Sequence, residues 1–201
     1  IITDMNQVLE KSAGHILEIS ECINFLKNQE KESRLEKITY ELIASILMMS
    51  QKLSKKAALE KINSVMSNGE AAEKFEKMVQ ALGGPSDILS SHEKHLKSNA
   101  IKKDIFPTKS GWVEKIKTRD LGLILIELGG GRKQTTDKIN FNVGYNNILR
   151  VGDKVNPKLP LLSVYTKSED DYEIVRKKIQ DCFIITDSEV SELPYTYEVI
   201  N

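Results

Sequence analysis

The hydrophobic period of this chain changes once along its length, and that change limits the folds open to it. Through about residue 90, apolar side chains recur at steps of three and four, the spacing of one helix face. Beyond residue 105 the period shortens towards two, which is typical of strands. We therefore expect a helical array followed by an α+β region. Such an array cannot by itself be a doubly wound domain.

One strand and four helices are expected in the first region. The helices cover about 13–27, 32–53, 55–66 and 70–82. The second has a wide apolar face from Leu35 to Met49, so we expect it to be covered on more than one side. The opening Ile1-Ile2 indicates the end of a buried strand whose sheet is missing, which suggests a fragment or a processed product.

A polar connector follows over about 86–104. Beyond it, strands are expected at about 105–108, 111–118, 147–151, 161–166 and 195–200, and helices at about 119–128 and 169–182.

Charge and hydropathy exclude several classes of protein. The chain has 29 acidic and 29 basic side chains, so no net field draws it to nucleic acid or anionic lipid. Its longest apolar runs, 42–49 and 121–126, fall far short of the ~20 residues of a membrane span, and no leader pattern opens the chain. We expect a cytoplasmic protein in which Cys22 and Cys182 are unpaired, buried thiols.

The run Gly129-Gly130-Gly131-Arg132-Lys133 is the first candidate for a binding role. Backbone N–H groups of glycines can surround an anion, and the two cations would assist. However, the run matches no nucleotide-binding motif and follows a helix instead of preceding one. Helix termination followed by a mobile loop is the favoured interpretation.

A second pattern points to a small β-sandwich. Gly-x-Val in segment 109–113, followed by V-G-D-x-V in 151–155 and an apolar pair in 159–162, is the strand pattern of biotinyl and lipoyl carriers. Gly152-Asp153 would make the turn between strands. A carrier needs its modified lysine at a tight hairpin tip, yet about thirty residues with a helix intervene here. A carrier-like or other non-catalytic interaction module is the alternative function.

The histidines give weaker signals. His92 and His95 could share a helix face, but their spacing without further ligands favours a solvated pair. His15, beside Gly14 near a helix start, is as suited to capping or packing as to ligation.

Several motifs in order resemble the thymidine and pyrimidine nucleoside phosphorylase family, over essentially the whole chain. The first is Thr3-Asp4-Met5-Asn6-Gln7 with Leu9, Gly14, Glu18 and Glu21; Val8 departs from the family's proline, which we expect to change only the local turn. The later ones are Gly69-Glu70-Ala71-Ala72 with Phe75 and Met78-Val79, Leu121-Gly122, Glu127 to Arg132, Asp137, Val143-Gly144 and Val151 to Val155.

This resemblance implies an α/β family fold with three domains. Residues 1–90 would supply the last strand and helices of the central α/β domain, 91–104 the connector, and 105–201 the hammerhead-like C-terminal α+β domain. The family catalyses reversible phosphorolysis, in which phosphate attacks the anomeric carbon of a pyrimidine deoxynucleoside and releases the base. The resemblance also implies a homodimer that needs no cofactor and uses phosphate as co-substrate.

The phosphate and base sites of the family lie earlier in its chain, so we expect no catalytic or substrate-binding residue here and no activity without the N-terminal part. Two roles remain. The resemblance places a monovalent cation such as potassium at Leu9, Ser12 and Glu21, oxygen ligands that suit a hard cation. The loop 129–144, with Gly129, Gly130, Gly131 and Arg132, is expected to close over the cleft.

Overall fold

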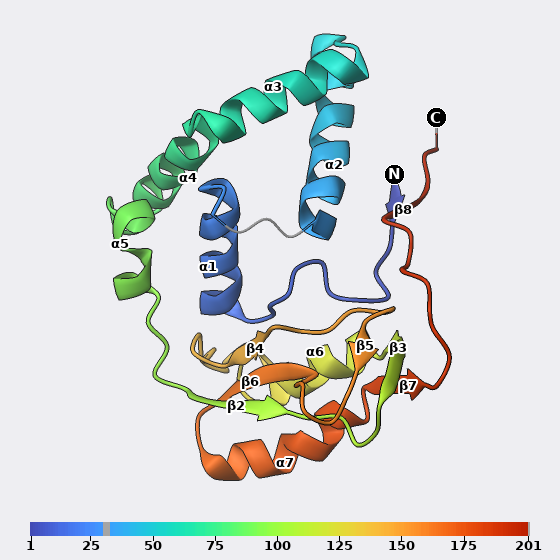
Figure 1. Ribbon diagram of the computed structural model, residues 1–201. Coiled ribbons are helices and arrows are strands. Elements are labelled where there is room, and N and C mark those ends of the chain that lie inside the picture. Colours follow the sequence, from blue (N-terminus) through green and yellow to red (C-terminus); the bar gives the residue numbers. More distant parts are fainter. Residues whose placement is uncertain (30–32, 201) are drawn as a thin grey trace. The chain divides into compact units, whose positions relative to one another are not determined.

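A computed structural model describes residues 1–29 and 33–200 (Figure 1). The chain divides into two compact units that interleave along the sequence. The first unit comprises Ile1–Thr3, Ile19–Lys97 and Tyr195–Asn201, and the second comprises Asp4–Glu18 and Ser98–Pro194. Among the described residues, none of the helices is both long enough and apolar enough to span a membrane.

The first unit is built from helices and one short ladder. Its helices are α1 (His15–Leu26, whose first turn is assigned to the second unit), α2 (Ser33–Gln51), α3 (Lys55–Ser67), α4 (Glu70–Ala81) and α5 (Ile88–His95). Ser54 caps α3 by accepting a hydrogen bond from the backbone N–H of Ala57 at 3.2 Å. Strand β1 (Ile2–Thr3) pairs antiparallel with β8 (Thr196–Glu198), so both described ends of the chain meet here.

The core of this unit is small, and α2 differs from expectation. Buried side chains in the core are Phe25, Leu35, Ala44, Ala58, Ile62 and Met66. On α2, Leu35 is buried, but Ile46 is 62% and Met49 is 84% exposed. The expected cover on more than one side is therefore wrong for the far half of α2, because α3 is the element that packs most extensively on it. Ile2, expected in a buried strand, is also exposed.

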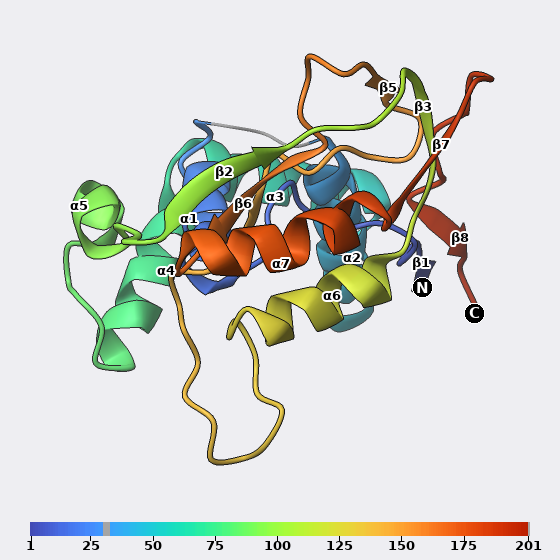
Figure 2. The ribbon, with the colours of Figure 1, turned by 90° about the horizontal axis from the view of Figure 1, so that it is seen from below.

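The second unit is an α+β fold with small antiparallel sheets (Figure 2). Its elements are β2 (Ile101–Ile105), β3 (Gly111–Ile116), α6 (Thr118–Glu127), β4 (Gly144–Asn146), β5 (Lys154–Val155), β6 (Leu162–Thr166), α7 (Glu169–Gln180) and β7 (Phe183–Thr186). One sheet has the order β2-β6-β4 and the other β5-β3-β7. Thus β6 and β3 are the central strands.

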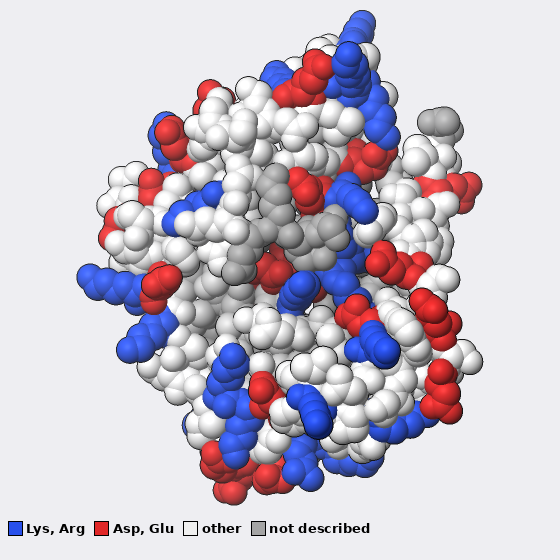
Figure 3. Space-filling view, in the orientation of Figure 1, with Lys and Arg blue, Asp and Glu red and all other residues white. Residues whose placement is uncertain are grey.

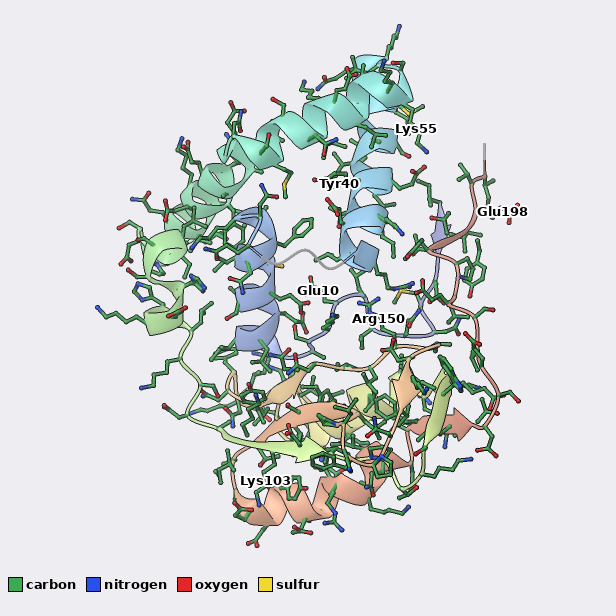
Figure 4. The ribbon with its side chains drawn as sticks, viewed as in Figure 1. Glu10, Tyr40, Lys55, Lys103, Arg150 and Glu198 are labelled. Atoms are coloured by element: carbon green, nitrogen blue, oxygen red, sulfur yellow. The ribbon has the colours of Figure 1, made fainter. Side chains whose placement is uncertain are left out.

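The core of the second unit draws on both sheets and both helices. Val113, Val164 and Ile179 are fully buried. Tyr145 is buried too, and its hydroxyl donates to the carbonyl oxygen of Leu121 at 3.1 Å, which ties β4 to α6. Burial raises the pKa of Tyr145 far above its usual range. On β2, Lys103, which Figure 4 labels, pairs with Glu169 at the start of α7.

The strand expected at 105–108 is instead β2 at Ile101–Ile105. Its centre is Lys102-Lys103-Asp104, and as an edge strand it can carry charges that hide the alternation. The strand expected at 147–151 is absent from that part of the described chain, because Asn147 has φ 54° and ends the ladder after Asn146. Segment 91–104, expected as a connector, contains more than half of α5 and most of β2.

Candidate functional site

The glycine run begins as the end of helix α6. Gly129 has φ 93°, a left-handed conformation that glycine adopts without strain. Its N–H donates to the Ile126 carbonyl at 3.0 Å, and the N–H of Gly130 donates to the Leu125 carbonyl at 2.9 Å. This pair of bonds is the Schellman motif. Two of the three glycine N–H groups are thus engaged in ending the helix, which confirms helix termination and weakens the anion-cradle interpretation.

The tip of the loop is held together by Asp137. Its carboxylate accepts the backbone N–H groups of Lys133 at 2.9 Å and Gln134 at 3.0 Å. These bonds, first from Gln134 and then from Lys133, hold the pKa of Asp137 below its usual value. Arg132 Nε donates to the Asp137 carbonyl oxygen at 3.2 Å. Residues 132–137 therefore form a self-bonded tip and not a structureless loop.

The returning end of the loop is fixed to the segment before α1. Ala13 and Tyr145 exchange backbone hydrogen bonds of 3.0 and 2.7 Å. The chains approach so closely that a Cβ at Gly14 would lie 2.6 Å from the carbonyl oxygen of Val143, and Gly14 has φ 124°. Across the loop, Asn140 N–H donates to the Gly129 carbonyl at 2.8 Å. Both stems of the loop are consequently anchored by backbone hydrogen bonds.

The exposed cations of the loop lie on its tip. Arg132, Lys133 and Lys138 are exposed, whereas the Asp137 carboxylate is engaged with backbone N–H groups. Figure 2 shows the loop reaching away from the end of α6. The tip can therefore offer positive charge to an anion, although the glycines themselves form no cradle.

Of the three expected cation ligands, two lie in the second unit. The Leu9 carbonyl oxygen accepts a hydrogen bond of 3.1 Å from Nη2 of Arg150, which Figure 4 labels. Ser12 is buried, and Glu21 lies on the part of α1 assigned to the first unit. A guanidinium on the Leu9 oxygen competes with any cation for the same lone pairs.

Residues 112–186, from β3 to β7, match a known family: the pyrimidine nucleoside phosphorylase C-terminal domain. The matched segment contains the whole loop with its Schellman end and its Asp137 tip. The chain carries a pyrimidine nucleoside phosphorylase C-terminal domain. The match confirms the resemblance for the motifs that lie within 112–186, and the family that it names is that of the pyrimidine nucleoside phosphorylases.

Within this phosphorylase domain, the paired segments of the carrier alternative do meet. Gly111 pairs with Val155 and Trp112 with Lys154 across β3 and β5, as expected from the glycine and valine pattern. Between those strands, however, lie α6 and the loop, where a carrier has its modified lysine on a tight hairpin. The carrier alternative is not favoured.

The histidines of the chain separate into different roles. His95 Nε2 lies 2.7 Å from Asp87 Oδ1, and this contact lowers the pKa of Asp87. Within the described ranges 1–29 and 33–200, no group of three or more His, Cys, Asp or Glu residues is arranged to hold a metal ion. His15, whose role was open, contacts the loop. The Asp137 tip was also missed, although an aspartate a few residues beyond a helix end is a common turn signal.

Cys22 and Cys182 are not joined in a disulfide, as expected; Cys182 is buried, whereas Cys22, which was expected to be buried too, is only half-buried. Burial raises the pKa of the Cys182 thiol to about 11. Neither cysteine belongs to the loop or its anchor. Acidic and basic side chains are interspersed on the face shown in Figure 3, in line with the balanced composition.

Proposed function

We propose that this chain is the C-terminal part of a thymidine phosphorylase, which converts thymidine and phosphate reversibly to thymine and 2-deoxyribose 1-phosphate. The observation that carries the proposal is the family match over 112–186. The motifs from Thr3 to Val79 support it, since they follow the order of the same family upstream of the matched segment. Phosphate and base would be bound by the N-terminal part.

The role proposed for this chain is closure by the loop 129–144. In phosphorolysis, water competes with phosphate for the anomeric carbon, so a closing segment that excludes water favours transfer to phosphate. A loop with fixed stems and a compact tip suits this role because few residues must reorganise. Exposed Arg132, Lys133 and Lys138 would bring positive charge towards a phosphate or sugar phosphate.

Complementation tests the function itself. The chain, alone and combined with the N-terminal part, is incubated with phosphate and either thymidine or uridine, and release of the free base is measured. We expect release only from the combined protein, dependent on phosphate and faster with thymidine. Preference for uridine would overturn the substrate, and no release with either nucleoside would overturn the function. Intact mass of the chain, without a lipoyl or biotinyl adduct, is the control for the carrier alternative.

The closing role needs a variant that leaves the helix end intact. Alanine at Gly130 would place its Cβ 2.6 Å from Cδ1 of Leu125, so loss of activity could come from the damaged end of α6. Asp137→Ala instead removes only the acceptor at the tip, and Asp137→Asn retains a side-chain oxygen there. In the combined protein we expect Asp137→Ala to lower kcat about tenfold, Asp137→Asn much less. Equal kcat in all three proteins would refute closure by this loop.

The expected ligands and partners belong to the same proposal. A monovalent cation at Leu9, Ser12 and Glu21 predicts that the combined protein is faster in potassium than in tetramethylammonium at equal ionic strength. A homodimer predicts twice the protomer mass in sedimentation. A cytoplasmic location agrees with two cysteines that are not joined in a disulfide. Equal rates in potassium and tetramethylammonium would overturn the cation site, and a single protomer mass would overturn the homodimer. Neither result would affect the proposed reaction.

A further inference from the structure

The imidazole of His15 contacts both ends of the glycine-rich loop. Its Nε2 lies 3.1 Å from the carbonyl oxygen of Gly130, which can only accept, so Nε2 carries the proton and donates. Its ring meets the ring of Phe141 edge to face, with centroids 5.1 Å apart and planes at 79°. One side chain at the start of α1 therefore bridges the residue where the loop leaves α6 and the residue where it returns.

Hydrogen bonds of the residues beside His15 hold its backbone in place. The Gly14 N–H donates to Glu18 Oε1 at 2.8 Å, and the Glu18 N–H donates to the Gly14 carbonyl at 2.9 Å, which sets the first turn of α1. The Ile16 N–H donates to the Phe141 carbonyl at 3.4 Å. The anchor of the imidazole is thus a hydrogen-bonded turn, whereas the described bonds of Arg132, Lys133 and Gln134 go to Asp137 within the loop tip.

We propose that His15 is the positioning residue of the loop: it fastens Gly130 to Phe141, so that closure is confined to a block between Gly131 and Ile139. The block turns as one body because the Asp137 carboxylate accepts backbone N–H groups of Lys133 and Gln134 within it. This inference rests on the proposed closing role, but the fastening itself is independent of the reaction. It assigns to His15 a role that is neither metal ligation nor helix capping.

Limited trypsin digestion of the chain measures the fastening directly, because Arg132, Lys133 and Lys138 are cleavage sites within the proposed block. Loss of one hydrogen bond and one ring contact should raise the population of the released loop, and hence the initial cleavage rate there, about three- to tenfold in His15→Ala. His15→Gln keeps a donor at a similar reach but lacks the ring, so its rate should lie between. Phe141→Leu should also raise it.

Two controls separate release of the loop from a general increase in trypsin cleavage of the chain. Cleavage at exposed Lys158, in another turn of the same unit, should be unchanged in His15→Ala, and His95→Ala in the first unit should leave the loop sites unchanged. Equal loop cleavage in His15→Ala and the parent chain overturns the proposal. So does a rise at Lys158 as large as that at the loop sites.

Kinetics of the combined protein then separates this inference from the proposed function. Because the loop is no longer fastened, we expect His15→Ala to lower kcat while the KM for thymidine stays within about twofold. His15→Gln should recover part of the lost kcat. Faster loop cleavage with unchanged kinetics would leave the fastening established and refute the closing role. Faster cleavage in a protein without any phosphorolysis would refute the proposed reaction alone.

Discussion

The two compact units differ in how fully each closes its own apolar core. In the second unit, side chains from both sheets and both helices are buried together, including Val113, Leu162 and Ile179. The first unit buries a smaller cluster and leaves Ile46, Met49 and Leu82 largely exposed. An apolar stripe at helical spacing therefore predicts a helix equally well in either case, but it does not by itself predict what covers that helix.

The largest effect should come from truncating the closed core. Leu162 is fully buried on central strand β6, so Leu162→Ala should lower the free energy of unfolding by about 2–5 kcal/mol. Ile46 on α2 is 62% exposed, and Ile46→Ala should change it by less than about 0.5 kcal/mol. Denaturant titration of both variants measures the contrast. Equal losses would mean that the two units do not differ in core closure.

A backbone contact gives the next effect, because the sheet of the second unit leaves no room at Gly111. A Cβ there would lie 2.3 Å from the carbonyl oxygen of Thr186, and φ is 148°. Gly111→Ala should cost on the order of 1–3 kcal/mol and separate β3 from β7. Gly122 in α6 has open space around it, so Gly122→Ala should stabilise the chain by about 0.5–1 kcal/mol. The opposite order of melting temperatures would contradict this packing.

Alkaline pH should weaken the second unit through Cys182. Burial raises the pKa of the Cys182 thiol in the folded state from 9.0 to about 11. Its contribution to the free energy of unfolding is therefore fully present below pH 9 and is lost as the pH rises towards 11. The stability of the parent chain should fall over this range by on the order of 1 kcal/mol more than that of Cys182→Ala. Denaturation at pH 8, 9.5 and 10.5 tests the sign. A parallel decline in both proteins would show that Cys182 makes no contribution.

Thiol labelling compares the two units without any mutation. Cys182 is buried and Cys22 is half-buried, so a maleimide should modify Cys22 well before Cys182 at pH 8. Cys182 should become reactive only when the second unit unfolds. Peptide mapping by mass spectrometry gives both rates, and prompt labelling of Cys182 would reveal a core that opens locally.

The smallest effect concerns the loop tip at low pH. Since backbone N–H groups depress the pKa of Asp137 below 3.8, the tip should keep its bonds through pH 3.8 and lose them only below it. Hydrogen exchange at Lys133 and Gln134 should then speed up relative to Asp137→Asn, whose amide does not titrate. Identical acid profiles in both proteins would show that the carboxylate does not hold the tip.

Sequence reasoning succeeded where one residue pattern fixed one local structure. Helices α3 and α7 lie close to their predicted ranges because apolar spacing agrees with the caps at Ser54 and Ser168, and α4 lies close to its range by apolar spacing after Gly69. It failed for β2, whose charged centre hides its alternation, and for β7, which follows α7 too closely to be separated by period.

The candidate site shows the same limit. Termination at Gly129 follows from local chemistry, and the sequence indicated it. The contact of His15 with Gly130 joins residues 115 positions apart, and its partner is a backbone oxygen that no residue pattern encodes. Likewise, nothing in the sequence links Arg150 to the Leu9 carbonyl.

The ladder between β1 and β8 has a consequence for synthesis of this chain. Ile2 and Thr3 are synthesised almost 200 residues before their partners Glu198 and Thr196. At roughly 5–20 residues per second, the first strand waits on the order of ten to forty seconds for its partner. The closed core of the second unit needs residues only as far as Phe183, so it can form during that wait and before the first unit is complete.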